Sequence, residues 1–289
     1  MRTWAAVLLF SVCHAALGWN AMGHSVVTIM AYEQLTPEAK VYFNRLNQAA
    51  SKVYPARSLV SASIWLDYLR YKDVNWYSSY HYVDDYFSPD GSTLPMTQTH
   101  NALWALQQAQ NTLLSKKASA FDQGIALRIM LHVVADIHQP LHTLSRVTAQ
   151  NPHGDKGGNA FALAHNSVAD NLHAYWDRGA GLLLSKKKKS RAQSYAIAKR
   201  LAIQYPCTKE DQDFDYPRWA QESRHIALNQ AYTIKEETTP SHHYQQEAQK
   251  QAQHRLSQAA CRLAHTLNTI YISHNLAPIG RSRNVGFID

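Results

Sequence analysis

The sequence is short of the residues that interrupt helices. Its 289 residues include only 11 Gly and 10 Pro, which is few for an all-β or a disordered protein. Long stretches rich in Ala, Leu, Gln, Lys and Arg favour helices instead. The chain also lacks internal repeats and a Gly/Ser-rich linker, and it is long enough to bury a core. We therefore expect one helical domain.

A hydrophobic run long enough to cross a bilayer is missing as well. Residues 4–12 form a short apolar run behind a positively charged start, and residues 16–18 read Ala-Leu-Gly, a small-residue cleavage site. The pattern predicts a signal peptide over residues 1–18 that is cut after Gly18, which leaves Trp19 as the new N-terminus. We expect the mature protein, residues 19–289, in the periplasm or outside the cell.

Cysteine is scarce, and the few cysteines agree with export. Cys13 falls in the predicted signal peptide, so the mature chain keeps Cys207 and Cys261. A disulfide between these two suits an oxidising compartment, and two reduced, buried cysteines are the alternative. The sequence has no Asn-x-Ser/Thr sequon, which excludes N-glycans. Both features suit a bacterial exported protein.

Acidic residues are outnumbered, since 21 Asp and Glu face 29 Lys and Arg for a formal charge of +8. A basic surface suits a polyanionic partner such as nucleic acid or an anionic membrane. Part of the excess is the lysine run 186–189, which is more typical of a solvated loop than of a binding site. The 16 His residues are the stronger anomaly because they concentrate beside carboxylates.

Helical periodicity and turn signals divide most of the chain into helices. Pro37 is suited to open a helix, and Pro140 has to end one. A glycine-containing loop over residues 151–159 predicts a small β-hairpin region near the middle of an all-α domain. The other helices are expected at residues 20–34, 58–71, 99–117, 121–138, 167–177, 191–205, 216–235 and 244–274.

A spacing of four residues recurs between His and Asp. His132 and Asp136 fall on one face of a helix, one turn apart, and His173 and Asp177 repeat the spacing. His142 follows the break at Pro140 and can point back toward the first pair. Imidazole and carboxylate together suit zinc, and a carboxylate can bridge two ions. A single pair is usually a surface ion pair, but two pairs with an added His favour a metal centre.

The expected mature N-terminus adds a chelating group. A free amine at Trp19 with its neighbouring carbonyl would bind a metal, and His24 follows five residues later. Taken alone, Trp19 would be a core residue and His24 a solvated one.

Six ordered elements resemble the type I nuclease family, the zinc-dependent single-strand-specific nucleases. The resemblance implies a phospholipase C/nuclease-like helical fold and hydrolysis of single-stranded DNA and RNA to 5′-phosphorylated products. It leaves open whether the protein also has 3′-nucleotidase activity. The elements are the Trp19–His24 spacing, Trp65-Leu66-Asp67, His81-Tyr82-Val83-Asp84, Asp136 to His142, Gly157-Gly158-Asn159, and Asn171 to Asp177.

The same resemblance implies three zinc ions and assigns their ligands. The first ion is held by Asp67, His81, His132 and Asp136, the second by the Trp19 amine and carbonyl, His24 and Asp136, and the third by His142, His173 and Asp177.

Roles in catalysis and in substrate binding follow by similarity. Asp136 bridges the close pair of ions, Asp84 orients the attacking water, and Arg70 clamps the phosphate. Asp84 could instead support a His ligand from behind. Asn159, Tyr82 and Phe161 are candidates for contacts with a base, although each is also compatible with ordinary packing.

Two other functions remain open. A zinc-dependent phospholipase C has the same fold, but its pattern has a longer gap between the terminal Trp and the first His, and Glu where this chain has Asp177. A non-catalytic zinc- or nucleic-acid-binding relic would not need Asp84. We expect a monomeric protein without an integral membrane segment, acting on single-stranded nucleic acid.

Overall fold

The structure, a computed structural model, describes residues 18–70, 72, 74–185 and 190–275, without the side chains of Arg70 and Ser190. The expected all-α fold is confirmed in this part of the chain. The α-helices are α1 (Ala21–Glu33), α2 (Pro37–Ser51), α3 (Leu59–Ala62), α4 (Trp65–Arg70), α5 (Ala102–Leu114), α6 (Ala120–Asp136), α7 (Leu172–Asp177), α8 (Ser190–Gln204), α9 (Tyr216–Asn229) and α10 (His242–Asn275). Short 3₁₀ turns are η1 (Ser78–His81), η2 (Pro140–His142), η3 (Gly179–Gly181), η4 (Lys209–Asp211) and η5 (Ala231–Thr233).

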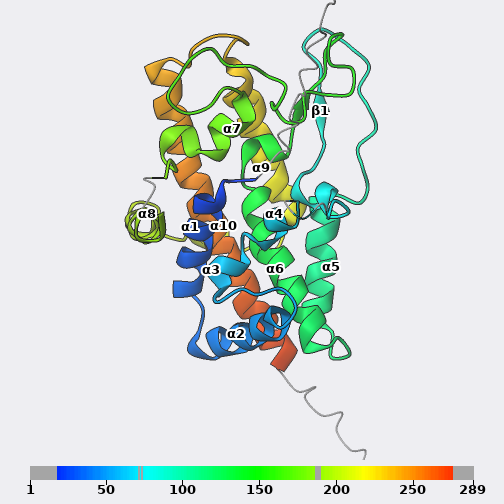
Figure 1. Ribbon diagram of the computed structural model, residues 1–289, viewed down its shortest axis with the longest axis vertical. Coiled ribbons are helices and arrows are strands. Elements are labelled where there is room, and N and C mark those ends of the chain that lie inside the picture. The colour runs from blue at the N-terminus through cyan, green and yellow to red at the C-terminus, as the bar shows by residue number, and fades with distance from the viewer. Residues whose placement is uncertain (1–17, 71, 73, 186–189, 276–289) are drawn as a thin grey trace, which may run out of the picture.

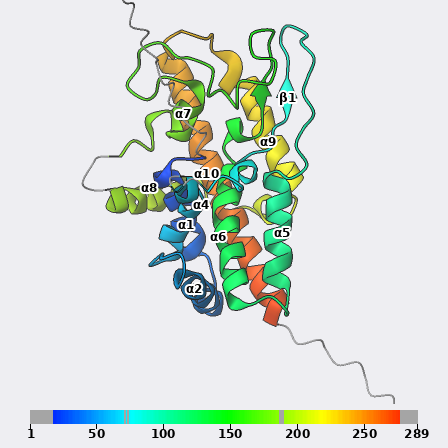
Figure 2. The same cartoon turned by 45° about the vertical axis from the view of Figure 1, so that its right-hand side comes forward.

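Helix α6 lies at the centre of the molecule and carries part of the candidate site at its end. It is surrounded by α1, α2, α5 and α10, and α10 runs along most of the long axis (Figures 1 and 2). Gly124 lets α2 approach closely, because a Cβ atom there would lie 2.3 Å from the carbonyl oxygen of Leu46. Almost all of α6 after its first turn is buried, so its C-terminal residues point into protein rather than solvent.

Local sequence signals fix where several helices begin. The side chain of Asn20 accepts hydrogen bonds from the amides of Met22 and Gly23 and caps α1. Thr36 caps α2, whose first residue is Pro37 as predicted. These caps satisfy amides that have no partner within their own helix.

Three predicted helices differ from those observed. The helix expected over residues 216–235 ends at Asn229 of α9 and is followed by η5, and the other two differ in their division or their start. The helix expected over residues 58–71 is split into α3 and α4 around Ser63, whose carbonyl oxygen lies 2.6 Å from Nδ1 of His132. The helix expected from residue 167 begins only at Leu172, because the Asn166 side chain accepts from two amides of a preceding turn and Asn171 caps α7. In both places a side chain competes with the regular helical hydrogen bonds.

The small β region is present, but its pairing is not the hairpin that the sequence predicts. Strands β1 (Tyr86–Phe87) and β2 (Ser145–Arg146) pair in parallel, with Tyr86 opposite Ser145. The loop of residues 151–159 contributes only an isolated antiparallel bridge between Asn151 and Thr148. The pairing therefore joins two segments that are distant in the sequence and places both beside the candidate site.

A disulfide joins Cys207 to Cys261 of α10, as expected from the sequence. Within the described residues, no helix combines the length and the apolar character needed to cross a membrane. The predicted signal peptide up to residue 17 and the lysine run 186–189 lie outside the described residues.

Candidate metal centre

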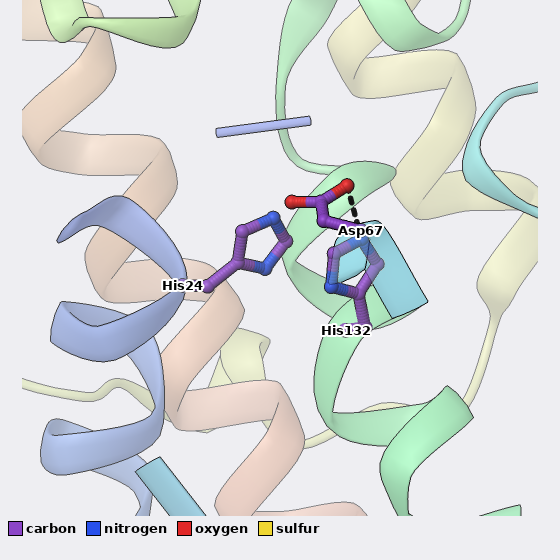
Figure 3. Close-up of side chains that lie close together, drawn as sticks. All are labelled: His24, Asp67 and His132. Atoms are coloured by element: carbon purple, nitrogen blue, oxygen red, sulfur yellow. Dashed lines mark ion pairs between the residues drawn. The ribbon is translucent and has the colours of Figure 1, made fainter. Parts of the chain in front are cut away.

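Five imidazoles and three carboxylates converge at the end of α6. They come from α1, α4, η1, α6, η2 and α7, and all are buried. Figure 3 shows one corner, in which the side chains on α1, α4 and α6 point toward one another. The ligand atoms form three groups, each within 4.8 Å: His24, Asp67 and His132; His81, His132 and Asp136; and His142, His173 and Asp177.

The first two groups meet at Asp136 and His132. Oδ2 of Asp136 lies 3.1 Å from Nε2 of His132 and 3.1 Å from Nδ1 of His81, while Oδ1 lies 3.3 Å from Nε2 of His24. Oδ1 of Asp67 lies 3.6 Å from Nε2 of His132. The two oxygens of Asp136 thus face different imidazoles, which is the geometry that a bridging carboxylate needs.

The third group is formed by the second His–Asp pair and the His after Pro140. Nε2 of His173 lies 3.4 Å from Oδ2 of Asp177 and 3.2 Å from Nε2 of His142. Asp177 and His173 are one turn apart on α7, and η2 brings His142 to them. The four-residue spacing and the break at Pro140 therefore bring these three side chains together, as the sequence predicts.

Backbone carbonyls orient three of these imidazoles from behind. Nδ1 of His132 lies 2.6 Å from the carbonyl oxygen of Ser63, and Nδ1 of His173 lies 2.7 Å from that of Gly157. Nδ1 of His142 contacts the carbonyl oxygen of His81 in the same way. Since a carbonyl can only accept, we assign a proton to Nδ1 in each ring, and this leaves Nε2 facing the cavity. Metal-binding His residues commonly show this arrangement.

The buried carboxylates make the cavity attractive to cations. Burial lowers the pKa of His132, but Asp136 and Asp67 raise it more strongly, to about 9. Burial raises the pKa of Asp177 well above its usual value, and the neighbouring Asp136 adds to this effect. Burial also tends to raise the pKa of Asp136, but the contacts with His132 hold it well below its ordinary value. A positive charge placed among these groups is therefore stabilised.

The residues present fit a metal ion. Both ring nitrogens of His24, Oδ1 of Asp67 and Oδ1 of Asp136 are buried and make no hydrogen bond. A buried polar atom without a partner costs roughly 1–3 kcal/mol. Imidazole nitrogens with carboxylate oxygens form a donor set that zinc accepts. Coordination would satisfy these atoms together.

Residues 18 and 19 enter this cavity. A Cβ atom on Gly18 would lie 1.6 Å from Oδ1 of Asp136 and 3.1 Å from Nε2 of His24, so its backbone passes directly against both. Trp19 is fully buried in the core, where its side chain packs against Gly23. The next residue, Asn20, is the N-cap of α1. The peptide between residues 18 and 19, where we expect cleavage, is thus next to the first two groups.

Of the candidate catalytic residues outside the cluster, Asp84 lies on the segment that contacts His142. Asp84 is half-buried and follows Val83, whose amide donates to the carbonyl of His142 at 2.7 Å. Burial raises the pKa of Asp84 to about 6, and a hydrogen bond from Ser145 opposes the rise. Arg70 is the last residue of α4, and its side chain lies outside the described part of the structure.

The three candidate base-binding residues differ in their exposure to solvent. Tyr82 is half-buried and directly follows His81. Asn159 is half-buried, and its side-chain amide donates to the carbonyl of Lys156 at 2.7 Å. Phe161 is only 1% exposed and packs in a core cluster beneath Arg146, whose guanidinium carbon lies 4.5 Å from the ring centre. The ring of Phe161 therefore packs in the core, which is the alternative that the sequence left open for this residue.

Sequence reasoning missed the residues that hold the ligands in place. Gln139 is buried, and its side chain donates to Oδ1 of Asp177 at 2.6 Å while accepting from the amide of Leu141. Asp155 is buried and accepts from the amides of Arg146 and Gly158, which fixes the start of the glycine loop. Gln139 stands between two sequence-predicted ligands, and this position was the one signal that could have identified it.

The known proteins to which this chain is similar are described as nucleases or endonucleases. A family profile described as S1/P1 nuclease matches residues 19–272. The chain is 25% identical to Nuclease S1 from Aspergillus oryzae over 55% of its own length and 53% of that protein, and 26% identical to Nuclease P1 from Penicillium citrinum over 55% and 57%. The aligned part thus spans little more than half of each fungal protein. Endonuclease 4 from Arabidopsis thaliana is 27% identical over 94% of this chain and 96% of that protein.

Proposed function

Because this chain belongs to the S1/P1 nuclease family, we propose that it is a zinc-dependent endonuclease that hydrolyses phosphodiester bonds in single-stranded DNA and RNA and leaves 5′-phosphorylated products. The observation that carries the proposal is the presence of three buried His/Asp groups, each with its ligand atoms close enough to hold a metal ion. The names of the fungal nucleases and the plant endonuclease support the nuclease activity in this proposal.

Three zinc ions per chain would be held by these side chains together with the mature N-terminus. Asp67, His81, His132 and Asp136 would hold one ion, and Asp136 would also serve the ion held by His24 and Trp19. The third ion would be held by His142, His173 and Asp177. Zinc at these positions supplies Lewis acidity, which makes water nucleophilic near neutral pH and neutralises charge on the phosphate.

The second ion of the close pair needs the mature N-terminus. In our proposal the chain is exported and cut after Gly18, and the new amine and carbonyl of Trp19 join His24 as ligands. The backbone of Gly18 already lies against Asp136 and His24. An uncut chain would keep an amide at this place, and an amide nitrogen is a poor ligand.

Asp84 accepts a proton from the attacking water and orients it. Its pKa of about 6 places the charged form at neutral pH while keeping it basic enough to attract the proton. Arg70, at the end of the helix that carries Asp67, contacts the phosphate. Tyr82 and Asn159, beside the two halves of the cluster, contact the base.

The decisive experiment compares the chain beginning at Trp19 with its Asp136→Asn variant after loading with zinc. The parent is expected to bind three zinc ions and to cleave single-stranded DNA and RNA in preference to duplex DNA. The variant is expected to lose more than one ion and nearly all cleavage, because two ions depend on Asp136. Asp122→Asn, at the exposed opposite end of the same helix, is the matched control and is expected to behave as the parent.

Phosphatidylcholine is tested in parallel. Release of its head group without cleavage of nucleic acid would replace the proposal with a phospholipase C. Three bound zinc ions without activity on any phosphodiester would indicate a binding protein instead.

A further inference from the structure

A buried serine lies between Asp84 and the glycine loop. Ser145 is 2% exposed and belongs to β2, where it pairs with Tyr86 of β1. Its amide donates to the carbonyl oxygen of Asp85 at 2.8 Å. The parallel strand pairing therefore fixes the backbone of Ser145 beside the segment that carries Asp84.

The hydroxyl of Ser145 has two defined neighbours. Its Oγ accepts a hydrogen bond of 2.7 Å from the amide of Gly157, in a fully buried position. A serine hydroxyl has a single proton to donate, and the carboxylate of Asp84 is the acceptor beside it, a contact that lowers the pKa of Asp84 against the effect of burial. The hydroxyl thus connects the side chain of Asp84 to one peptide group of the glycine loop.

Gly157 links Ser145 to the third group of ligand atoms. Its carbonyl oxygen accepts from Nδ1 of His173 at 2.7 Å, which leaves Nε2 of that ring directed at His142 and Asp177. Gly157 has a φ of +62°, and a Cβ atom there would lie 2.2 Å from the carbonyl oxygen of Leu141. The loop therefore has little room to move while these bonds are made.

We propose that Ser145 is a positioning residue that sets Asp84 and His173 in one fixed geometry through the Gly157 peptide. Ser145 is not a member of the three ligand groups. Its hydroxyl fixes the direction of the carboxylate that orients water, and it holds the carbonyl that aligns His173. This inference rests on the proposed function, in which Asp84 orients the attacking water and His173 binds zinc. It also gives the glycine loop a task other than contact with a base.

The test uses the zinc-loaded mature chain with Ser145→Ala, Ser145→Thr and Ser257→Ala. Ser257 is a matched control because it is also 2% exposed and its hydroxyl makes no hydrogen bond. The measurements are kcat and KM on single-stranded DNA, zinc content at increasing chelator concentration, and the melting temperature.

Ser145→Ala is expected to lower kcat by about tenfold to a hundredfold, the usual effect of removing an outer partner of a metal centre. We expect KM to stay unchanged and one zinc ion to be removed at a lower chelator concentration than in the parent. Ser145→Thr, which keeps the hydroxyl, is expected to restore most of kcat, and Ser257→Ala to match the parent.

Two results would overturn the inference while leaving the nuclease proposal intact. One is a Ser145→Ala variant that matches Ser257→Ala in kcat and in zinc retention. The other is a variant that loses all zinc together with several degrees of melting temperature, which would make Ser145 merely structural. If the parent itself binds zinc and cleaves no nucleic acid, the proposed function has failed instead.

Discussion

Replacing Gly157 with Ala tests whether the glycine loop supports the metal centre. The φ of +62° lies in the left-handed region, and the new Cβ atom would lie 2.2 Å from the carbonyl oxygen of Leu141 and 3.2 Å from Nδ1 of His173. A backbone oxygen at 2.2 Å has to move away. The movement would displace the peptide whose carbonyl aligns His173. We therefore expect a weakened third metal site in addition to backbone strain.

The chain offers controls that separate these two effects. Gly91 has a φ of +79° and nothing within 4 Å of an added Cβ atom, so Gly91→Ala measures the left-handed strain alone. That strain costs about 1–2 kcal/mol, and each kcal/mol lowers Tm by about 2–4 °C in a chain of this size. Gly158, with a φ of +84° and its nearest contact at 3.3 Å, is an intermediate case.

The assay is zinc retention under chelator, with Tm measured on the same samples. Gly157→Ala is expected to hold one of its zinc ions about 10- to 100-fold more weakly than the parent, and to melt below Gly91→Ala. Gly91→Ala is expected to keep all its zinc. If Gly157→Ala loses no more zinc than Gly91→Ala, the reasoning is refuted, because the clash has then relaxed without reaching His173.

Three further outcomes follow from the site and its surroundings. Because burial raises the pKa of Asp84 to about 6, activity should fall as pH drops through about 6 and the carboxylate becomes protonated, and Asp84→Asn should abolish this limb of the pH–rate profile. Tyr82→Ala should raise KM with little change in Tm, whereas Phe161→Ala should cost about 3–5 kcal/mol of stability with KM unchanged. Opening the disulfide by Cys207→Ser together with Cys261→Ser frees a loop of 54 residues, which should cost about 4 kcal/mol without changing the zinc content.

The sequence predicted part of the convergence of His and Asp side chains because helical spacing carries geometric information. Residues four apart on a helix have to lie on one face, so the pairs His132–Asp136 and His173–Asp177 imply two binding faces. The break at Pro140 implies the return of His142 toward them. The structure brings these groups together as expected. Spacing does not give the distance between the two pairs, which depends on the packing of α7 against η2, the turn that follows α6.

The sequence left the environment of Phe161 open for a related reason. An aromatic residue that follows a glycine loop gives the same sequence pattern whether its ring faces the solvent or the core. Only the packing of Arg146 and Tyr232 over the ring decides between them. The parallel pairing of Tyr86 with Ser145 was equally inaccessible, since it joins short segments without any alternating pattern.

The groups that orient the centre are harder to infer from sequence than the ligands, because many of them are backbone atoms. The carbonyls of Ser63, His81 and Gly157 each face the Nδ1 of a different imidazole, and every residue type has a carbonyl. A carbonyl becomes specific only where the chain leaves regular structure, as it does between α3 and α4 and at the left-handed Gly157. The irregular positions of this fold are therefore where its chemistry is aligned, and substitutions there should affect metal binding more than their burial alone suggests.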